Sequence, residues 1–330
     1  MASAQAAIDQ FYKETRLRRI NLDTMTKPTG GGQTSQTIRR VGLLQGIWLP
    51  ISITVSGSLS NLNTLGIVSA IRRIRVTVNS SGDIFSCSGA GALYLVNEQI
   101  GDFYSLGQGT TNNQGGSAVS AATFKLYFYI PIAMNRRDPV GLVLLQSEQQ
   151  TVELTIDWEA DTTVATGATI TGSVRPQIDA FSVPASGVLP PLNYIHQVIE
   201  DSYTVSGSGD ITYSPIRGQV YLSVYHGLSL LQSSADSASR LQVIVNGSDT
   251  WKDMQVADMD AEYYLYHGRN RKAGVYPVDY MASSELGALG LTRDFFNTLG
   301  TTDYRHILTA TGAGTLTTVR RMLALIPAVN

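Results

Sequence analysis

Two alternating segments, residues 123–132 and 151–158, constrain the fold of this chain more than any other feature. In each segment an apolar side chain occupies every second position, as in FKLYFYIPI and VELTIDW. Period-two alternation is typical of strands that bury one face against a core. The polar residues NRRDP and the apolar run VGLVLLQ separate the two segments, so a long excursion joins them instead of a tight turn.

Strand patterns continue along most of the chain, which predicts an all-β protein. Pro50 interrupts one of them, and we expect an edge or bulge position there because proline cannot donate to a ladder. A short helix is predicted at 294–299, and 106–122 is predicted to be a surface loop. The predicted strands lie at 47–55, 74–78, 92–103, 170–183, 194–205, 217–226, 240–246, 275–280 and 315–327.

A chain of 330 residues exceeds the usual size of a single core, so two domains are expected. The sequence PASGVLPP at 184–191 has the composition of a linker. It divides the strand pattern into residues 38–183 and 192–330. Each part is about the size of an eight-stranded sandwich.

The first 37 residues differ from the rest and are predicted to form a helical arm. Residues 2–19 have helical spacing without Pro or Gly, with apolar Ile8, Phe11 and Tyr12 on one side and basic residues opposite. Gly30, Gly31 and Gly32 are predicted to form a hinge between helix and body. Residues 1–46 carry seven cations and three acids, a net +4 within a chain of net charge -2. The arm therefore faces either an anionic partner, such as lipid or nucleic acid, or acidic surface of its own chain or a neighbour.

Composition narrows the classes of protein further. Only 15% of the residues are charged, which favours a protein that buries much of its surface against neighbours. Cys87 is the single cysteine, so an intrachain disulfide and a cysteine zinc cluster are both excluded. No apolar run of signal-peptide type starts the sequence, and none approaches the ~20 residues of a membrane span. We therefore expect assembly in a reducing cytoplasm.

No motif for catalysis or for a cofactor emerges. The four histidines lack metal-ligand spacing, and His226 extends a strand alternation, which indicates a packing role. The segment DYRH at 303–306 has no accompanying nucleophile motif. Two acidic runs could hold Ca²⁺ if they alternate along strands, or could be solvated turn residues. These runs are Asp157, Glu159 and Asp161, and Asp258, Asp260 and Glu262.

The order of an aromatic strand with YIPIAM, an apolar excursion and QTVELTIDW resembles part of the first jelly roll in a known family. That family is the double-jelly-roll major capsid proteins of tailless icosahedral phages with an internal membrane, the tectivirus-like lineage. HGRNRKAGVYPVDY at 267–280 resembles a late segment of the second jelly roll. The resemblance implies two consecutive eight-stranded jelly rolls and a structural protein without enzymatic activity or cofactor.

The resemblance also implies partners. Three copies would form a pseudo-hexagonal capsomer that contacts neighbouring capsomers, a vertex (penton) protein and the internal membrane or its proteins, with no specific nucleic-acid sequence. The chain would then be part of the virion shell. The arm would lie on the inner face and contact the membrane through Ile8, Phe11, Tyr12, Lys13, Arg16, Arg18 and Arg19.

Two other functions are compatible with a pair of β-sandwiches. One is a carbohydrate-binding or glycan-degrading phage spike that uses aromatic platforms and one of the acidic runs. The other is a secreted lectin-like pair of domains, which the missing signal-peptide pattern disfavours. A trimer of hexagonal outline would favour the capsid protein, and a glycan-binding monomer would favour the spike.

Overall fold

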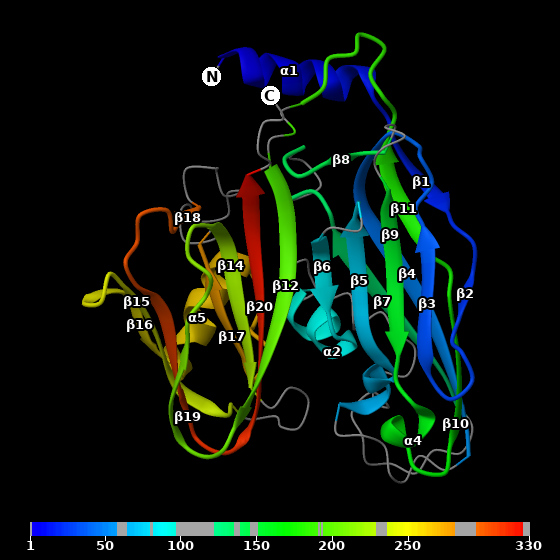
Figure 1. Cartoon of the computed structure of the whole chain (residues 1–330). Helices are drawn as coiled ribbons and strands as arrows, with labels where there is room; N and C mark the ends of the chain where they lie inside the picture. The colour runs from blue at the N-terminus through cyan, green and yellow to red at the C-terminus, as the bar shows by residue number, and fades with distance from the viewer. Residues whose placement is uncertain are drawn as a thin grey trace. The chain divides into compact units, whose positions relative to one another are not determined.

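The structure, a computed structural model, divides the chain into two compact units (Figure 1). Unit 1 comprises residues 1–199 with 324–330, and unit 2 comprises residues 200–323. The structure describes residues 2–57, 65–79, 82–96, 122–134, 139–145, 151–190, 192, 194–228, 236–280 and 295–325.

The first sheet of unit 1 is organised around one long strand, β4. This strand pairs with β7 and β8 on one side and with β10 and β11 on the other, all antiparallel. The short strands β1 and β2 form the two ends of the order β1-β11-β4-β10-β2. The seven strands are β1 (Leu17–Asn21), β2 (Met25–Thr26), β4 (Leu43–Ser56), β7 (Ala122–Pro131), β8 (Val143–Leu144), β10 (Thr169–Val174) and β11 (Gln177–Phe181).

The second sheet of unit 1 has the order β6-β5-β9-β3. Strand β12 then pairs in parallel with β6 through Val198 and Ile199. The strands named here are β3 (Gly32–Thr37), β5 (Ile71–Val78), β6 (Gly82–Cys87), β9 (Val152–Trp158) and β12 (Tyr194–Val205). The helical elements of this unit are α1 (Ala2–Glu14), η1 (Gly66–Ala70), α2 (Gly89–Gly91), η2 (Ala92–Val96) and α4 (Asp161–Val164).

The alternation in the sequence corresponds to the core of unit 1. The apolar positions of β7 and β9 are buried, and Lys125 and Tyr127 between them on β7 are exposed. Since β7 and β9 belong to different sheets, their apolar faces supply the core from both sides. The buried side chains are Phe124, Leu126, Phe128 and Ile130 on β7, and Val152, Leu154, Ile156 and Trp158 on β9.

Pro50 lies in a central strand with a regular register to β7, and not at the edge or bulge position that its chemistry predicted. Its pairing with Tyr127 of β7 belongs to a ladder that continues without interruption. On the other side of β4 the partner changes: β11 pairs with β4 up to Trp48, and β10 pairs with it from Ile51 onwards. The carbonyl of Pro50 accepts from Arg175 N at 3.3 Å in the turn between these two partners. The missing N–H therefore falls where the neighbouring ladder is already interrupted.

Unit 2 contains the second set of strands and one long helix. One sheet places β14 between β17 and β20, with β18 also on β14 and β12 beside β20; the other has the order β13-β19-β15-β16. The bounds are β13 (Gly209–Tyr213), β14 (Val220–Leu228), β15 (Ala238–Val245), β16 (Asp249–Gln255), α5 (Val256–His267), β17 (Val275–Asp279), β18 (Phe296–Asn297), β19 (Tyr304–Ala310) and β20 (Gly314–Leu325).

Four predicted elements differ from those in the structure. The strand predicted at 170–183 is divided into β10 and β11. The first helix ends at Glu14, because residues 17–21 pair with β11 as an edge strand. Residues 92–96 are helical where a strand was predicted, since periodicity cannot separate a buried helix from a strand in a short apolar run. The short helix predicted at 294–299 is a strand at 296–297. The loop predicted at 106–122 lies outside the described residues up to 121.

Two glycines provide a matched test of this backbone. Gly42 has φ of +117°, and a Cβ there would lie 2.1 Å from the carbonyl oxygen of Phe181. Gly30 has φ of +75° with nothing within 4 Å of the Cβ position. We expect Gly42→Ala to cost about 3–5 kcal/mol, because the main chain of β11 must move, and Gly30→Ala to cost about 1–2 kcal/mol. Urea unfolding of both variants would measure this, and equal losses would contradict the assigned close approach.

Candidate functional site

Two of the four histidines meet inside unit 2, although 80 residues separate them in the sequence. His226 is on β14 and His306 is on β19, and each is 1% exposed. Nε2 of His226 lies 2.8 Å from Nδ1 of His306. Strands β14 and β19 belong to different sheets, so this hydrogen bond joins the two sheets of the unit.

The hydrogen bonds continue on both sides of the pair. Nδ1 of His226 lies 2.9 Å from Oγ1 of Thr318 on β20. Nε2 of His306 lies 2.9 Å from the hydroxyl of Tyr304, which lies 2.5 Å from the hydroxyl of Tyr280. One consistent assignment has Thr318 donating to His226, His226 to His306, His306 to Tyr304, and Tyr304 to Tyr280. Both imidazoles are neutral in this arrangement, and each ring nitrogen is used.

Burial sets the charge state of this His–Tyr network. It lowers the pKa of His226 to about 3. Burial also lowers the pKa of His306 well below its ordinary value, and the neighbouring His226 contributes in the same direction. The pKa values of Tyr280 and Tyr304 are raised, again chiefly by burial. The network therefore holds neutral groups at pH 7 and resembles a buried polar contact between sheets more than an acid–base site.

The segment DYRH at 303–306 divides between the two faces of β19. Tyr304 and His306 point into the core, and Arg305 pairs with Asp303 at 3.3 Å near the surface. A dyad of His306 with Asp303 is therefore not formed. The sequence did predict an inward His226, but no spacing rule links His226 to His306.

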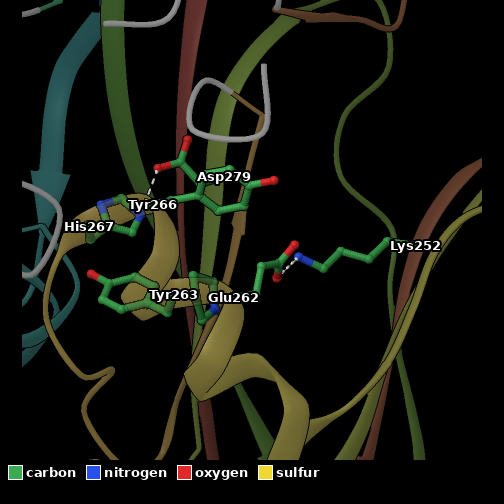
Figure 2. Close-up of a pocket in the computed structure, with 7 residues that line it drawn as sticks. Lys252, Glu262, Tyr263, Tyr266, His267 and Asp279 are labelled. Carbon is green, nitrogen blue, oxygen red and sulfur yellow. Dashed lines mark hydrogen bonds and ion pairs between the residues drawn. The ribbon is translucent and has the colours of Figure 1, made fainter. Parts of the chain in front are cut away.

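A small pocket lies beside α5 and is lined by residues of β16, α5 and β17 (Figure 2). Lys252 Nζ lies 2.6 Å from Oε2 of Glu262, and His267 Nε2 lies 3.7 Å from Oδ2 of Asp279. The ring of His267 stacks on Tyr263 with centroids 4.2 Å apart. Burial lowers the pKa of His267, and Asp279 opposes that shift. The charged groups of the pocket thus face one another in pairs.

The two acidic runs do not form cation sites. Asp258, Asp260 and Glu262 lie on helix α5 and not on a strand, so Asp260 is not on the face that Asp258 and Glu262 share. Four of the six carboxylates pair with cations: Asp157 with Arg75, Asp161 with Lys27, Asp260 with Arg271, and Glu262 with Lys252. Within the ranges that the structure describes, no group of three or more His, Cys, Asp or Glu could hold a metal ion.

The N-terminal helix packs onto unit 1 through its predicted apolar stripe. Phe11 is 0% exposed, and its ring lies 5.2 Å from that of Phe181. Tyr12 packs on the same cluster, and Ile8 is half-buried. The cluster contains Phe11, Leu43, Ala133, Leu142 and Phe181, with Tyr12, Leu144, Val183, Leu189 and Leu192 packed against it.

The predicted linker contacts this helix as well. Oε2 of Glu14 accepts hydrogen bonds from N and Oγ of Ser186, at 3.1 and 2.6 Å. Leu189 of the same segment packs on the Phe11 cluster. Helix α1 is thus held against unit 1 by contacts within its own chain.

The predicted basic residues have different surroundings. Arg19 forms a bidentate pair with Asp179 at 2.7 and 2.9 Å, and Trp48 Nε1 donates to the same carboxylate at 2.8 Å. Arg16 Nη1 donates to the carbonyl of Thr15 at 2.9 Å. Lys13 and Arg18 are exposed. The charge asymmetry left open whether the basic residues face an anionic partner or acidic groups of a protein chain. Arg19 pairs with an acidic group of its own chain.

Gly30, Gly31 and Gly32 form a turn with positive φ at all three positions. Strands β1 and β2 separate this turn from helix α1, and both are hydrogen-bonded into the first sheet. Gly32 itself pairs with Trp158 of β9. The glycines therefore connect two strands of the body, which differs from the predicted hinge next to the helix.

Truncation of the Phe11 side chain would measure how much the packing of α1 contributes to the stability of unit 1. We expect Phe11→Ala to destabilise unit 1 by about 3–5 kcal/mol, because a fully buried aromatic side chain is removed from a formed cluster. Leu17→Ala is the control, since Leu17 is 47% exposed just beyond the helix. Urea unfolding monitored in unit 1 is the measurement. Equal, small effects would mean that the helix is detached in solution.

Comparisons with known proteins place the fold. No protein-family model matches the sequence, and no curated protein matches it either. The major capsid protein of Sulfolobus Turreted Icosahedral Virus (STIV) superposes with a TM-score of 0.72 at 14% identity, over 96% of this chain and 100% of that chain. For the major capsid protein of bacteriophage PM2, the TM-score is 0.58 at 11% identity, over 96% and 100%.

A capsid chain of PBCV-1 virus gives a TM-score of 0.63 at 12% identity, over 95% of this chain and 97% of that chain. The similarity therefore extends through both units, and the prediction of an all-β double-jelly-roll fold is confirmed. None of the helices in the described ranges has the length and apolar content that crossing a membrane requires.

Proposed function

We propose that this chain is a major capsid protein that self-assembles into the shell of an icosahedral virion. The observation that supports this most is the match of the fold along 96% of the chain to the whole major capsid protein of STIV. Insertions or missing domains would have reduced the matched share of either chain. The paired charges and neutral buried groups of unit 2 are compatible with a structural role.

The capsomer would be a homotrimer of pseudo-hexagonal outline in contact with neighbouring capsomers and a vertex (penton) protein. Residues 38–183 and 192–330 would be the main parts of the two jelly rolls, with 184–191 as the connection between them. Strands β1, β2 and β3 from residues 17–37 would complete the sheets of the first. Large obligate interfaces bury roughly 2,000 Å² or more and rely on apolar and aromatic contacts. A chain with 16 tyrosines and 15% charged residues suits such contacts.

Helix α5 supplies a surface suited to contact with another copy. Its inner face buries Val256, Met259 and Tyr263. The outer side exposes two large apolar side chains, Tyr264 at 59% and Leu265 at 57%, beside the exposed acids Asp258 and Asp260. Large apolar side chains exposed next to each other can mark a contact with another molecule. In the proposed function that molecule is a neighbouring subunit.

The N-terminal segment would lie on the inner face of the shell, towards an internal membrane or its proteins. With Phe11 packed in unit 1, the contact would be mainly electrostatic and made by exposed cations such as Lys13 and Arg18. Each cation near an anionic lipid surface contributes roughly 1 kcal/mol, so binding by one copy would be weak and sensitive to salt. Many copies in one shell would make it effective. Assembly would take place in the host cytoplasm.

Native mass spectrometry with negative-stain electron microscopy tests the proposed function. We expect trimers at micromolar concentration and particles of hexagonal outline or closed shells. A monomer that persists on concentration, or one that binds glycans, would contradict the proposal.

A charge on the outer face of α5 would test the proposed contact. We expect Leu265→Lys to weaken trimer formation at least about 100-fold, because a cation would be buried in an apolar interface. Thr250→Lys on exposed β16 is the control, with the same added charge and no apolar loss. Circular dichroism would establish that both variants fold. Trimers of unchanged stability in Leu265→Lys would exclude α5 from the interface.

Neutralising two exposed cations would test the proposed inner-face contact. We expect Lys13→Gln with Arg18→Gln to reduce binding to anionic vesicles about 10-fold or more at low salt, with trimers unchanged. Binding to neutral vesicles is the control. If the variant sediments with anionic vesicles as well as the unaltered chain does, these residues do not contact lipid.

A further inference from the structure

The His–Tyr network joins elements that must separate if unit 2 opens. His226 and Thr318 face each other across the β14–β20 ladder of one sheet. His306 and Tyr304 are on β19 of the other sheet, and Tyr280 directly follows β17. Two direct bonds, from His226 to His306 and from Tyr280 to Tyr304, therefore cross between the sheets.

The two imidazoles have no arrangement that accommodates two added protons. If His226 alone were protonated at Nδ1, Oγ1 of Thr318 would have to accept instead of donate, while His306 would keep its neutral arrangement. If both rings were protonated, two N–H groups would face each other across the 2.8 Å between Nε2 and Nδ1. That arrangement loses the hydrogen bond and adds repulsion between like charges in a buried site.

No carboxylate adjoins the pair to compensate such a charge among the groups of the described residues that face it. From β13, Tyr213 packs edge-on against His226, with ring centroids 5.5 Å apart. From β12 and β20, Asp201 and Arg320 pair with each other, and Tyr213 donates to Asp201 at 2.9 Å. The remaining facing groups are the hydroxyls of Tyr280 and Tyr304 and the ring of Tyr221, which lies 5.3 Å from that of Tyr304.

We propose that the His226–His306 pair is an acid-operated release for unit 2: it holds the two sheets together while both rings are neutral and favours their separation when protons become available. This role goes beyond the proposed capsid function and does not depend on it. In an assembled shell it would lower the acid resistance of one unit while leaving the other intact.

The direction of the pH dependence follows from linkage. In the open unit the two histidines regain ordinary pKa values near 6.5, whereas in the closed unit the pKa of His226 is about 3 and that of His306 is also lowered. Above pH 6.5 neither state takes up a proton, and the contribution to stability is complete. As the pH falls from about 6.5 towards 3, only the open state binds protons, so closure weakens up to tenfold per pH unit for each histidine.

Hydrogen exchange measured by mass spectrometry on the full chain tests the proposal, because it follows the two units separately. After correction for intrinsic exchange, amides of β14 and β19 are expected to open roughly 100-fold more readily at pH 5.0 than at pH 6.5. Amides of β4 and β7 in unit 1 are the internal reference. Equal changes in both units, or no change in β14 and β19, would overturn the proposal.

Two variants distinguish a titrating pair from a merely structural one. His226→Gln with His306→Gln keeps polar groups in place without a titratable ring, and we expect the excess pH dependence of β14 and β19 to disappear. Tyr280→Phe removes one hydroxyl of the network and keeps both histidines, so it should lower protection at every pH and leave the pH dependence unchanged. If the double variant does not fold, His306→Gln alone should reduce the excess from about 100-fold to about tenfold. An undiminished pH dependence in the glutamine variants would refute the proposal.

Discussion

Strand β4 is the constraint on which most of unit 1 depends. Over fourteen residues it is paired along both edges, with β7 and β8 on one side and β10 and β11 on the other. Its side chains at 47, 49, 51, 53 and 55 are buried, so the strand contributes to the core along its length. A shift of one residue would turn this entire apolar set towards solvent, so burial fixes the register. The change of partner at Pro50 lets one long strand support two shorter ones.

The two units use polar groups inside the fold in different ways. Unit 1 buries an ion pair: Lys27 has no exposed side-chain area and meets Asp161 at 2.5 Å, which connects β2 to α4. Asp179, at 2% exposure, is held by Arg19 and Trp48. Unit 2 also buries charged side chains in ion pairs, Arg271 with Asp236 and Arg320 with Asp201, but in addition it joins its sheets through uncharged rings and hydroxyls. An ion pair stabilises the fold until the pH is low enough to protonate its carboxylate. A buried neutral imidazole begins to lose its stabilising contribution at about pH 6, where the unfolded chain starts to bind a proton.

Alternation in the sequence predicts several of the longer strands, because it reports directly which side chains point inward, but β13, β16 and β19 were not predicted. Strands β7, β9 and β12 match their predicted ranges closely for that reason. Predictions were wrong where the local sequence pattern fits both a helix and a strand, or where pairing with a distant segment determines the secondary structure. Residues 92–96 are apolar in either a strand or a helix, and residues 17–21 become a strand only because β11 offers a free edge. The His226–His306 contact could not be predicted, because it depends on how β14 and β19 face each other across the core. Composition and periodicity predicted only two β-sandwiches. The more specific prediction of a double jelly roll came from the family resemblance.

The docking of α1 has a consequence for the order in which the chain folds. The helix is synthesised before the rest of unit 1, yet the cluster that holds it includes Phe181, Leu189 and Leu192 as well as Leu43. A 13-residue helix is marginal in water by itself, so Phe11 has no stable partner until most of unit 1 has been synthesised. Contacts over such separations slow folding, because a long loop must close before they contribute. The docking of α1 would then be a late step in forming unit 1, and the surface around the Phe11 cluster would stay incomplete until that step.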